Sequence, residues 1–154
     1  MKPRDLISEF LSVKRFAMAG VSRDRSEFSR KLFREFRDRG YDIIPVNPGA
    51  DEIDGIRCLA HVRDINPPVT AALLMTSPSA TEDILRECAD GGVTLVWIYG
   101  ISGEKEISPA ARKICQECGI ELVPGYCPYM FMPMTAFFHR IHGFAQRLLG
   151  SYPV

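Results

Sequence analysis

The chain has 154 residues and 46% of them are hydrophobic, which is enough for one core and too little for two full domains. Lysine plus arginine equals aspartate plus glutamate at 19 each, so the net charge disfavours nucleic acid or an anionic membrane as a partner. The five scattered cysteines are not the pattern of a secreted disulfide scaffold, and no apolar run reaches the roughly 18 residues of a membrane span. We therefore expect one cytoplasmic domain over residues 1–154, without a transmembrane segment, in which any anion site is local.

The first half of the chain predicts alternating helices and strands. A short helix around residues 3–11 precedes an apolar strand in "RFAMAG", and residues 26–39 have the spacing of an amphipathic helix. "YDIIPVNPG" predicts a second strand with a Pro-Gly exit, and "GIRCLAHVRDI" fits one very short strand and one helical turn. The helix over residues 26–39 is expected to bury Phe28, Leu32, Phe33 and Phe36.

The second half repeats this alternation. Residues 71–76 are apolar and predict a strand, and Ser77 is placed to cap the helix that follows. "VTLVWIYG" and "IELVPG" predict two more strands, separated by a helix that Ser108 caps. In the helix after Ser77, the row expected to face the core is Ala80, Ile84 and Cys88.

Strands that alternate with helices and are apolar on both faces predict a parallel sheet covered on both sides. The fold class is therefore α/β, a three-layer doubly wound Rossmann-like fold with a mainly parallel sheet of five to six strands. Ligands bind such sheets outside the carboxyl ends of the strands, near the switch in strand order. We expect one crevice from the segments that follow the strands: "GVSRDRS", "VNPG", "TSPSAT", "YGISGE" and "PGYCP".

The segment after the first strand has the chemistry of a phosphate site. The start of the following helix offers unpaired N–H groups and a favourable dipole, and Ser22, Ser26 and Ser29 add hydroxyl groups. Arg23 and Arg25 are suited to bidentate contacts with phosphate oxygens. The alternative interpretation is that the two arginines only form a solvated loop.

NAD fits this loop poorly. The dinucleotide fingerprint needs three glycines, and an acidic residue at the end of the second strand for the ribose hydroxyls. Here Gly20 is the single glycine of the loop, and the second strand ends in Val46, Asn47 and Pro48. The carboxylate is therefore missing from the position where NAD requires it.

Five short motifs occur in order at the predicted strand ends: "MAGVSRD", "GYDIIPVNP", "TSPSAT", "VWIYGI" and "CP" in "PGYCPYM". In this order and spacing the chain resembles the coenzyme A-binding domain family over roughly residues 10–130. These are small proteins similar to the N-terminal domain of the succinyl-CoA synthetase alpha subunit. The resemblance implies a Rossmann-like domain whose cofactor is coenzyme A.

The resemblance also implies which residues bind the CoA nucleotide. The pyrophosphate would lie by the first motif and the adenosine end by the second. The family often has a lysine after "VNP", where this chain has Gly49, and this difference leaves a related nucleotide open as the ligand. The implied contact residues are Gly20, Val21, Ser22, Arg23, Arg25, Ser26, Val46, Asn47, Pro48, Thr76, Ser77, Pro78, Tyr99, Gly100, Ile101, Cys127 and Pro128.

No catalytic or metal-binding constellation is predicted. His61, His139 and His142 have no carboxylate or serine partner that the sequence identifies at a strand end. We therefore expect surface or packing roles for the three histidines. Carboxylates are scattered along the chain without a paired arrangement.

Three cysteines need separate interpretations. Cys115 and Cys118 have the spacing of a redox or zinc pair, but the dipole at a helix C-terminus disfavours thiolate there. Cys118 is therefore expected to join an ordinary core row with Ala111 and Ile114. Cys127 is expected to face the crevice, where its thiol could exchange with that of CoA. The alternative is that "CP" is a structural turn shaped by Pro128.

Residues 131–154 are predicted to form a C-terminal helical extension beyond the resemblance. Thr135 is placed as its N-cap, and the apolar face is Phe137, Ile141, Phe144 and Leu148. This face is expected to pack back on the sheet. The alternatives are a homodimer contact and a membrane surface.

Together these patterns predict a protein that binds coenzyme A or an acyl-CoA at the carboxyl ends of the strands. It would act without catalysis of its own, as a carrier, sensor or regulatory protein. One alternative is a small enzyme, either a thiol-dependent CoA disulfide redox enzyme that uses Cys127 or an oxidoreductase with a nicotinamide cofactor. Another is an interaction module that has lost its ligand.

Overall fold

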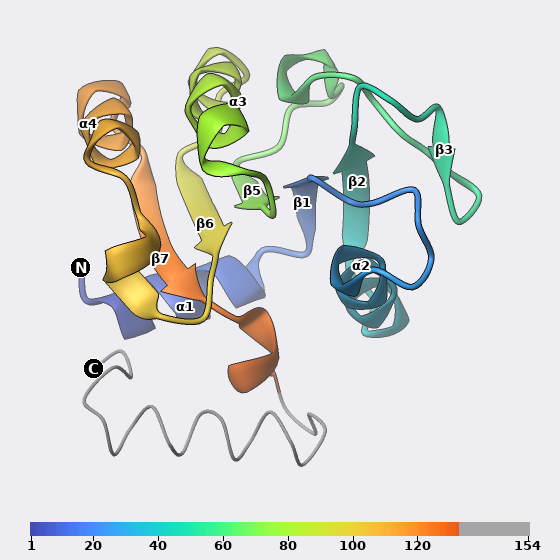
Figure 1. Ribbon diagram of the computed structural model, residues 1–154, viewed down its shortest axis with the longest axis horizontal. Coiled ribbons are helices and arrows are strands. Elements are labelled where there is room, and N and C mark those ends of the chain that lie inside the picture. The colour runs from blue at the N-terminus through green and yellow to red at the C-terminus, as the bar shows by residue number, and fades with distance from the viewer. Residues whose placement is uncertain (133–154) are drawn as a thin grey trace.

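The computed structural model describes residues 1–132, and at its centre is a five-stranded parallel sheet (Figure 1). All four strand pairings in this sheet are parallel. The predicted α/β class and the range of five to six strands are therefore confirmed. In spatial order the strands are β2 (Asp42–Val46), β1 (Arg15–Ala19), β5 (Ala71–Leu74), β6 (Leu95–Tyr99) and β7 (Glu121–Tyr126).

Helices cover both faces of the sheet. α1 (Pro3–Ser12) and α2 (Phe28–Asp38) pack on one face, below the strands in Figure 1. α3 (Pro78–Asp90) and α4 (Pro109–Cys118) pack on the other face, above the strands in the same view. The predicted three-layer, doubly wound arrangement is confirmed.

Side chains alternate between the two cores along each strand, because successive residues of a strand point to opposite faces. In β1, Phe16 belongs to the core with α1 and α2, and Ala17 belongs to the core with α3 and α4. Trp97 of β6 is fully buried against Phe10, and its indole N–H donates to the Tyr126 carbonyl oxygen at 2.8 Å. The largest core side chain is thus buried without an unsatisfied donor.

A short hairpin beside β2 was only half predicted. β3 (Glu52–Ile53) and β4 (Ile56–Arg57) are antiparallel, and Asp54 and Gly55 join them with φ values of 50° and 79°. Asp-Gly between apolar residues is a strong hairpin signal, because both turn positions need positive φ. The expected short strand and helical turn are β4 and the 3-10 helix η1 (Val62–Asp64).

The prediction that a helix begins at residue 26 was wrong by two residues. Asp24 Oδ1 accepts hydrogen bonds from the Ser26 backbone N–H at 2.8 Å and from Ser26 Oγ at 2.7 Å. Such local bonds from side chain to backbone compete with helix formation. Glu27 therefore takes the N-cap position, and Ser26 stays in the β1–α2 loop, which we define as residues 20–27.

The predicted C-terminal helix lies, from residue 133 on, outside the described residues, and so does its dimer contact. The two residues before that point, Phe131 and Met132, follow the 3-10 helix η3 (Pro128–Met130) and pack on the core with α1 and α2. None of the helices within residues 1–132 is long and apolar enough to cross a membrane.

Gly20 is expected to tolerate no side chain. Its φ is +85°, and a Cβ atom there would overlap the Met75 carbonyl group. We expect Gly20→Ala to lower the free energy of unfolding by about 3 kcal/mol, because overlap adds to the cost of positive φ. Gly40→Ala is the matched control, since Gly40 has φ +88° and a Cβ atom there would meet no other atom within 4 Å. Urea unfolding measures both variants, and equal losses would contradict the prediction.

Candidate functional site

The carboxyl ends of β1, β2 and β5 meet at a pocket of about 470 Å³. It lies at the switch point of the sheet, because β1 stands between β2, which follows it in the chain, and β5. The structure thus brings three of the predicted strand ends together. Seven of the residues predicted from the sequence line the pocket: Gly20, Val21, Ser22, Val46, Asn47, Pro48 and Thr76.

The remaining wall was not predicted. It consists of Ala19, Ala60, His61, Ala80, Asp83, Ile84 and Glu87. Ala80, Ile84 and Cys88 were predicted to face the core. Cys88 is buried and Ile84 packs against the core with α3 and α4, so the prediction is confirmed for these two residues, and it was wrong for Ala80, which lines the pocket. The buried residues of α3 are Thr81, Leu85 and Cys88, and beside them Ala80 and Ile84 line the pocket.

Asn47 joins the end of β2 to the β1–α2 loop. Its Nδ2 donates to the Val21 carbonyl oxygen at 3.0 Å, and its Oδ1 accepts from the Gly49 backbone N–H at 2.8 Å. Beside it, the Gly20 backbone N–H donates to the Val46 carbonyl oxygen at 3.2 Å. The Asn47 amide therefore shapes the wall of the pocket.

Serine hydroxyls hold the loop in the same way. The Ser22 backbone N–H donates to Ser29 Oγ at 2.9 Å, and Ser22 Oγ accepts from the Asp24 backbone N–H at 3.0 Å. The backbone and side-chain hydrogen bonds from Ser26 lower the pKa of Asp24 below its usual value. Ser22 keeps its own hydroxyl proton, which is available to a ligand oxygen at the edge of the pocket.

Arg23 and Arg25 are exposed on this loop. Neither forms an ion pair with any residue from 1 to 132. The Arg23 guanidinium lies beside Gly49, where its Cζ would be 3.8 Å from a Cβ atom. Two guanidinium groups on a loop that borders a pocket are suited to bind an anion such as phosphate.

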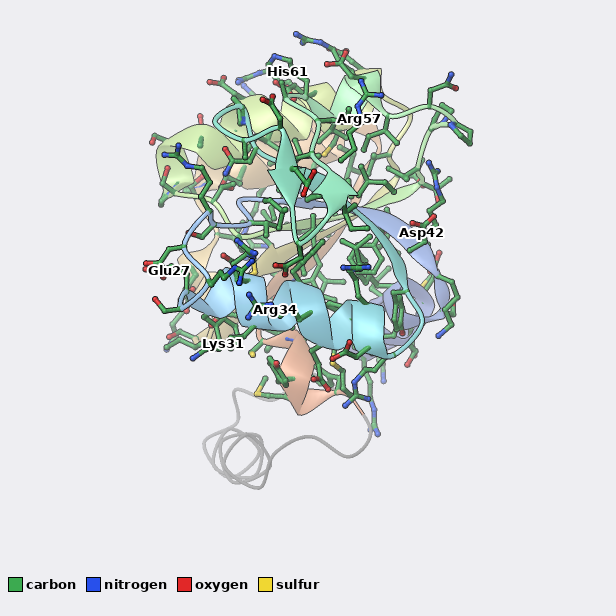
Figure 2. All side chains as sticks on the ribbon, turned by 90° about the vertical axis from the view of Figure 1, so that its right-hand side faces the viewer. Glu27, Lys31, Arg34, Asp42, Arg57 and His61 are labelled. Atoms are coloured by element: carbon green, nitrogen blue, oxygen red, sulfur yellow. The ribbon has the colours of Figure 1, made fainter. Side chains whose placement is uncertain are left out.

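Arg30 supports the β1–α2 loop from α2. Its Nη1 donates to the carbonyl oxygens of Ser22 at 3.2 Å and Arg23 at 3.1 Å, and its Nη2 forms an ion pair with Asp54. Arg34 Nε reaches the second Asp54 oxygen at 2.9 Å. Figure 2 shows Arg34 on α2, below the β3–β4 hairpin that carries Asp54. The hairpin and the loop are therefore linked through one side chain that is 5% exposed.

His61 has a carboxylate partner that was not predicted. Its Nδ1 lies 2.8 Å from Glu87 Oε1, and Glu87 Oε2 accepts from the Val62 backbone N–H at 3.2 Å. Both side chains line the pocket, and in Figure 2 His61 lies on the far side of the hairpin from Arg34. The partners are 26 positions apart, so no local pattern could pair them.

This chain matches the family described as the CoA binding domain over residues 14–133. It belongs to that family. The match includes the pocket, the β1–α2 loop and the hairpin, so the resemblance inferred from the five motifs is confirmed.

Two proteins are similar in sequence to this CoA binding domain. An ADP-forming acetate–CoA ligase of Methanocaldococcus jannaschii is 26% identical over 129 residues, which are 80% of this chain and 18% of the ligase. The chain thus spans less than a fifth of that enzyme. The uncharacterized protein YneT of Bacillus subtilis is 26% identical over 115 residues, which are 74% of this chain and 82% of YneT.

A solved structure shows the same fold. A hypothetical protein from Pyrococcus horikoshii has a TM-score of 0.73 and 23% identity to this chain, over 83% of this chain and 87% of that one. At 23% sequence identity this similarity supports the fold alone.

The carboxyl ends of β6 and β7 lie outside the 470 Å³ pocket of the CoA binding domain. The backbone N–H groups of Ile101 and Ser102 donate to Glu106 Oε1 at 2.9 and 2.6 Å, and a side chain on Gly100 would overlap Glu106. The Tyr99 ring packs 5.5 Å from that of Phe28, and burial raises the pKa of Tyr99 to about 12. These residues form a separate wall along the same edge of the sheet.

The start of α3 lies between the pocket and the wall at the carboxyl ends of β6 and β7. Ser77 holds the predicted N-cap position, but its hydroxyl pairs with Ser79 Oγ at 3.2 Å and makes no side-chain cap. Pro78 is the first helical residue and lines a small hollow together with Thr76 and Ile98. The predicted contact residues therefore extend from the pocket across the carboxyl ends of β5 and β6.

The cysteines differ from their predictions in two places. All five are free thiols. Cys127 was expected to face the crevice, but its side chain is 3% exposed, and burial raises the pKa of its thiol to about 11. α4 buries Cys115 in its core row and leaves Cys118 exposed, so the row expected to include Cys118 was wrong. Residues 1–132 contain no group of three or more histidine, cysteine or acidic residues arranged to hold a metal ion.

Asp54 is expected to make the free energy of unfolding of the domain depend on pH in the acidic range. Burial acts to raise the pKa of its carboxyl, but the hydrogen bonds from Arg34 and Arg30 outweigh burial and lower the pKa. Because the pKa of Asp54 is lower in the folded state, its carboxylate stabilises the fold at every pH above the pKa of an unfolded aspartate, which is about 3.9. This stabilisation is lost as the pH falls through the pKa of Asp54 in the folded state.

We expect Asp54→Asn to lower the free energy of unfolding at pH 7 by about 3 kcal/mol, because the Arg30 charge stays buried without its partner. The variant should also lose less stability than the wild type between pH 5 and pH 3. Asp42→Asn is the control, since its carboxylate is 71% exposed and its ion pair with Arg15 is worth about 0.5 kcal/mol. Urea unfolding at several pH values measures both variants, and similar losses would argue against the buried pair.

Proposed function

We propose that this CoA binding domain binds coenzyme A or an acyl-CoA in the pocket at the carboxyl ends of β1, β2 and β5. The observation that carries the proposal is the position of two exposed guanidinium groups, Arg23 and Arg25, on the loop that borders an apolar pocket. CoA has a nucleoside for such a pocket and several phosphate charges for such a loop.

The pocket and the loop would bind different parts of the ligand, the nucleoside in the pocket and the phosphates at the loop. The pocket has apolar side chains from β1, β2 and α3, and its volume of about 470 Å³ is in the range of small-molecule sites. The phosphates would lie at the β1–α2 loop, beside the Ser22 hydroxyl and the two arginines. The rest of CoA would extend along the edge of the sheet toward Tyr99, Gly100 and Ile101.

Gly49 does not remove positive charge from the site. The resemblance implies a lysine after the "VNP" motif, and at that position of this chain the Arg23 guanidinium lies beside Gly49. Arg23 would supply the phosphate contact that the resemblance implies for the lysine. This arrangement supports CoA, with its additional phosphate, over a nucleotide that carries fewer charges.

Two observations support binding without catalysis. The Cys127 thiol is buried, and its pKa of about 11 keeps it protonated at neutral pH, which disfavours thiol exchange. The end of β2 carries Asn47, whose amide is bonded within the wall, in place of the carboxylate that NAD requires. We therefore propose a carrier, sensor or regulatory role in the cytoplasm.

Replacement of Arg23 and Arg25 together by alanine is expected to weaken CoA binding about 10-fold or more, because two charged contacts to phosphate are lost. The decrease of affinity with salt should also become shallower. Calorimetric titration with CoA, and with NAD in parallel, measures both effects. Arg4→Ala with Lys113→Ala is the control, because it removes two exposed charges from α1 and α4. Unchanged affinity in the Arg23 and Arg25 variant, or tighter binding of NAD than of CoA, would overturn the proposal.

Cys127→Ser is expected to bind CoA as tightly as the wild type, because a buried and protonated thiol takes no part in binding. Serine keeps the acceptor for the backbone N–H groups of Tyr129 and Met130, which bond to this thiol. Calorimetry measures the affinity, and mass spectrometry after incubation with CoA disulfide tests for a mixed disulfide. A mixed disulfide that forms on the wild type and not on the variant would favour the redox enzyme instead.

A further inference from the structure

The orientation of His61 is set by a single carboxylate. Glu87 uses one oxygen for His61 Nδ1 at 2.8 Å and the other for the backbone N–H of the next residue, Val62, at 3.2 Å. Glu87 is 18% exposed and His61 is 38% exposed, so the pair lies at the wall of the pocket and is open to it. The bond to Val62 fixes the Glu87 carboxylate beside the start of η1, and the ring cannot turn without breaking its bond to that carboxylate.

This arrangement decides the proton positions on the neutral ring. An ionised carboxylate only accepts hydrogen bonds, so Nδ1 must carry the proton that it shares with Glu87. Nε2 is then the acceptor of the neutral ring, and no residue from 1 to 132 bonds to it. The wall of the pocket therefore presents a hydrogen-bond acceptor at a fixed place.

The charges of the pocket favour a neutral ligand group with hydrogen-bond donors. Its lining among residues 1–132 includes Asp83 and Glu87 and neither lysine nor arginine. A phosphate inside would face two carboxylates, whereas an amino group or a hydroxyl would find acceptors. The arginines stand outside, on the β1–α2 loop.

The geometry points to His61 as a residue that selects the nucleoside of the ligand, by accepting at Nε2 a hydrogen bond from an amino group of the base. Glu87 is its positioning residue. This inference rests on the proposed function, and it names the part of the ligand that enters the pocket. The phosphates remain at the loop with Arg23 and Arg25.

Other charged groups lie around His61. Glu87 and Asp83 come from α3, and Arg63 and Asp64 follow His61 in η1. A proton on Nε2 would turn the acceptor into a donor, next to an amino group that is a donor itself. A ring protonated at both nitrogens is therefore expected to bind the base more weakly than the neutral ring.

Two substitutions test the inference at pH 8. His61→Ala removes the acceptor and should weaken the binding of CoA and ADP about 10-fold. In Glu87→Gln the amide oxygen accepts from Val62, so the amide NH₂ faces Nδ1 and shifts the ring proton to Nε2. This isosteric change should therefore cost about as much as His61→Ala. Asp90→Asn is the matched control, because it removes a carboxylate at the end of α3 outside the pocket, and its affinities should equal those of the wild type.

The pH dependence separates this role from a merely structural one. The probe is dephospho-CoA, because it lacks the phosphate monoester that titrates near pH 6. Its affinity for the wild type should be lower at pH 5.5 than at pH 8, and its affinity for His61→Ala should be the same at both pH values. Circular dichroism at both pH values checks that the two proteins remain folded.

Each outcome decides between the two proposals. Unchanged affinities in His61→Ala and Glu87→Gln would overturn the role of His61 and leave CoA binding intact. Tighter binding at low pH that is lost in His61→Ala would place a protonated His61 on a phosphate, and would also overturn it. If the wild type binds ADP and not CoA, the proposed function fails, while the comparison of variants with ADP still tests His61. If it binds neither, both proposals fail.

Discussion

The site depends on the hydrogen bonds and the ion pair of the buried Arg30 guanidinium. It joins the β1–α2 loop, the helix α2 and the β3–β4 hairpin, because its donors reach two loop carbonyl oxygens and the Asp54 carboxylate. A charge that is 5% exposed must have such partners, since burying it alone would cost several kcal/mol. The loop that carries Arg23 and Arg25 is therefore held in place before any ligand arrives.

The residues around this loop have two different roles, since some hold the structure and others are exposed to a ligand. Side chains that hold the structure are bonded within it, since Arg30 is buried and Asn47 is half-buried, whereas Arg23 and Arg25 are exposed on the loop that borders the pocket. On the opposite wall, Glu87 orients His61. A ligand with phosphates at one end and a neutral group with donors at the other would match both sides, and a CoA nucleotide has that form.

Local patterns predicted the elements well and their orientation less well. Apolar runs identified the strands, and helical spacing identified α2, α3 and α4. A helix turns by about 100° per residue, so an apolar row shifted by one position is hard to recognise when both rows contain apolar residues. This is why Ala80 was placed in the core, although it lines the pocket, and why the pocket contact of Ile84 was not predicted. Ser26 was placed in a helix because the competing bond to Asp24 is visible only as geometry.

The sequence by itself determined the α/β class, the strand ends that meet at the switch point and the family of the chain, because these follow from periodicity and from motifs of adjacent residues. Tertiary structure decided which side chains reach the pocket, that Cys127 is buried, and that the pairs Arg30–Asp54 and His61–Glu87 form. The partners in these pairs are 24 and 26 positions apart. Contacts of this kind depend on how helices and hairpins pack against the sheet, and no local pattern of residues records that packing.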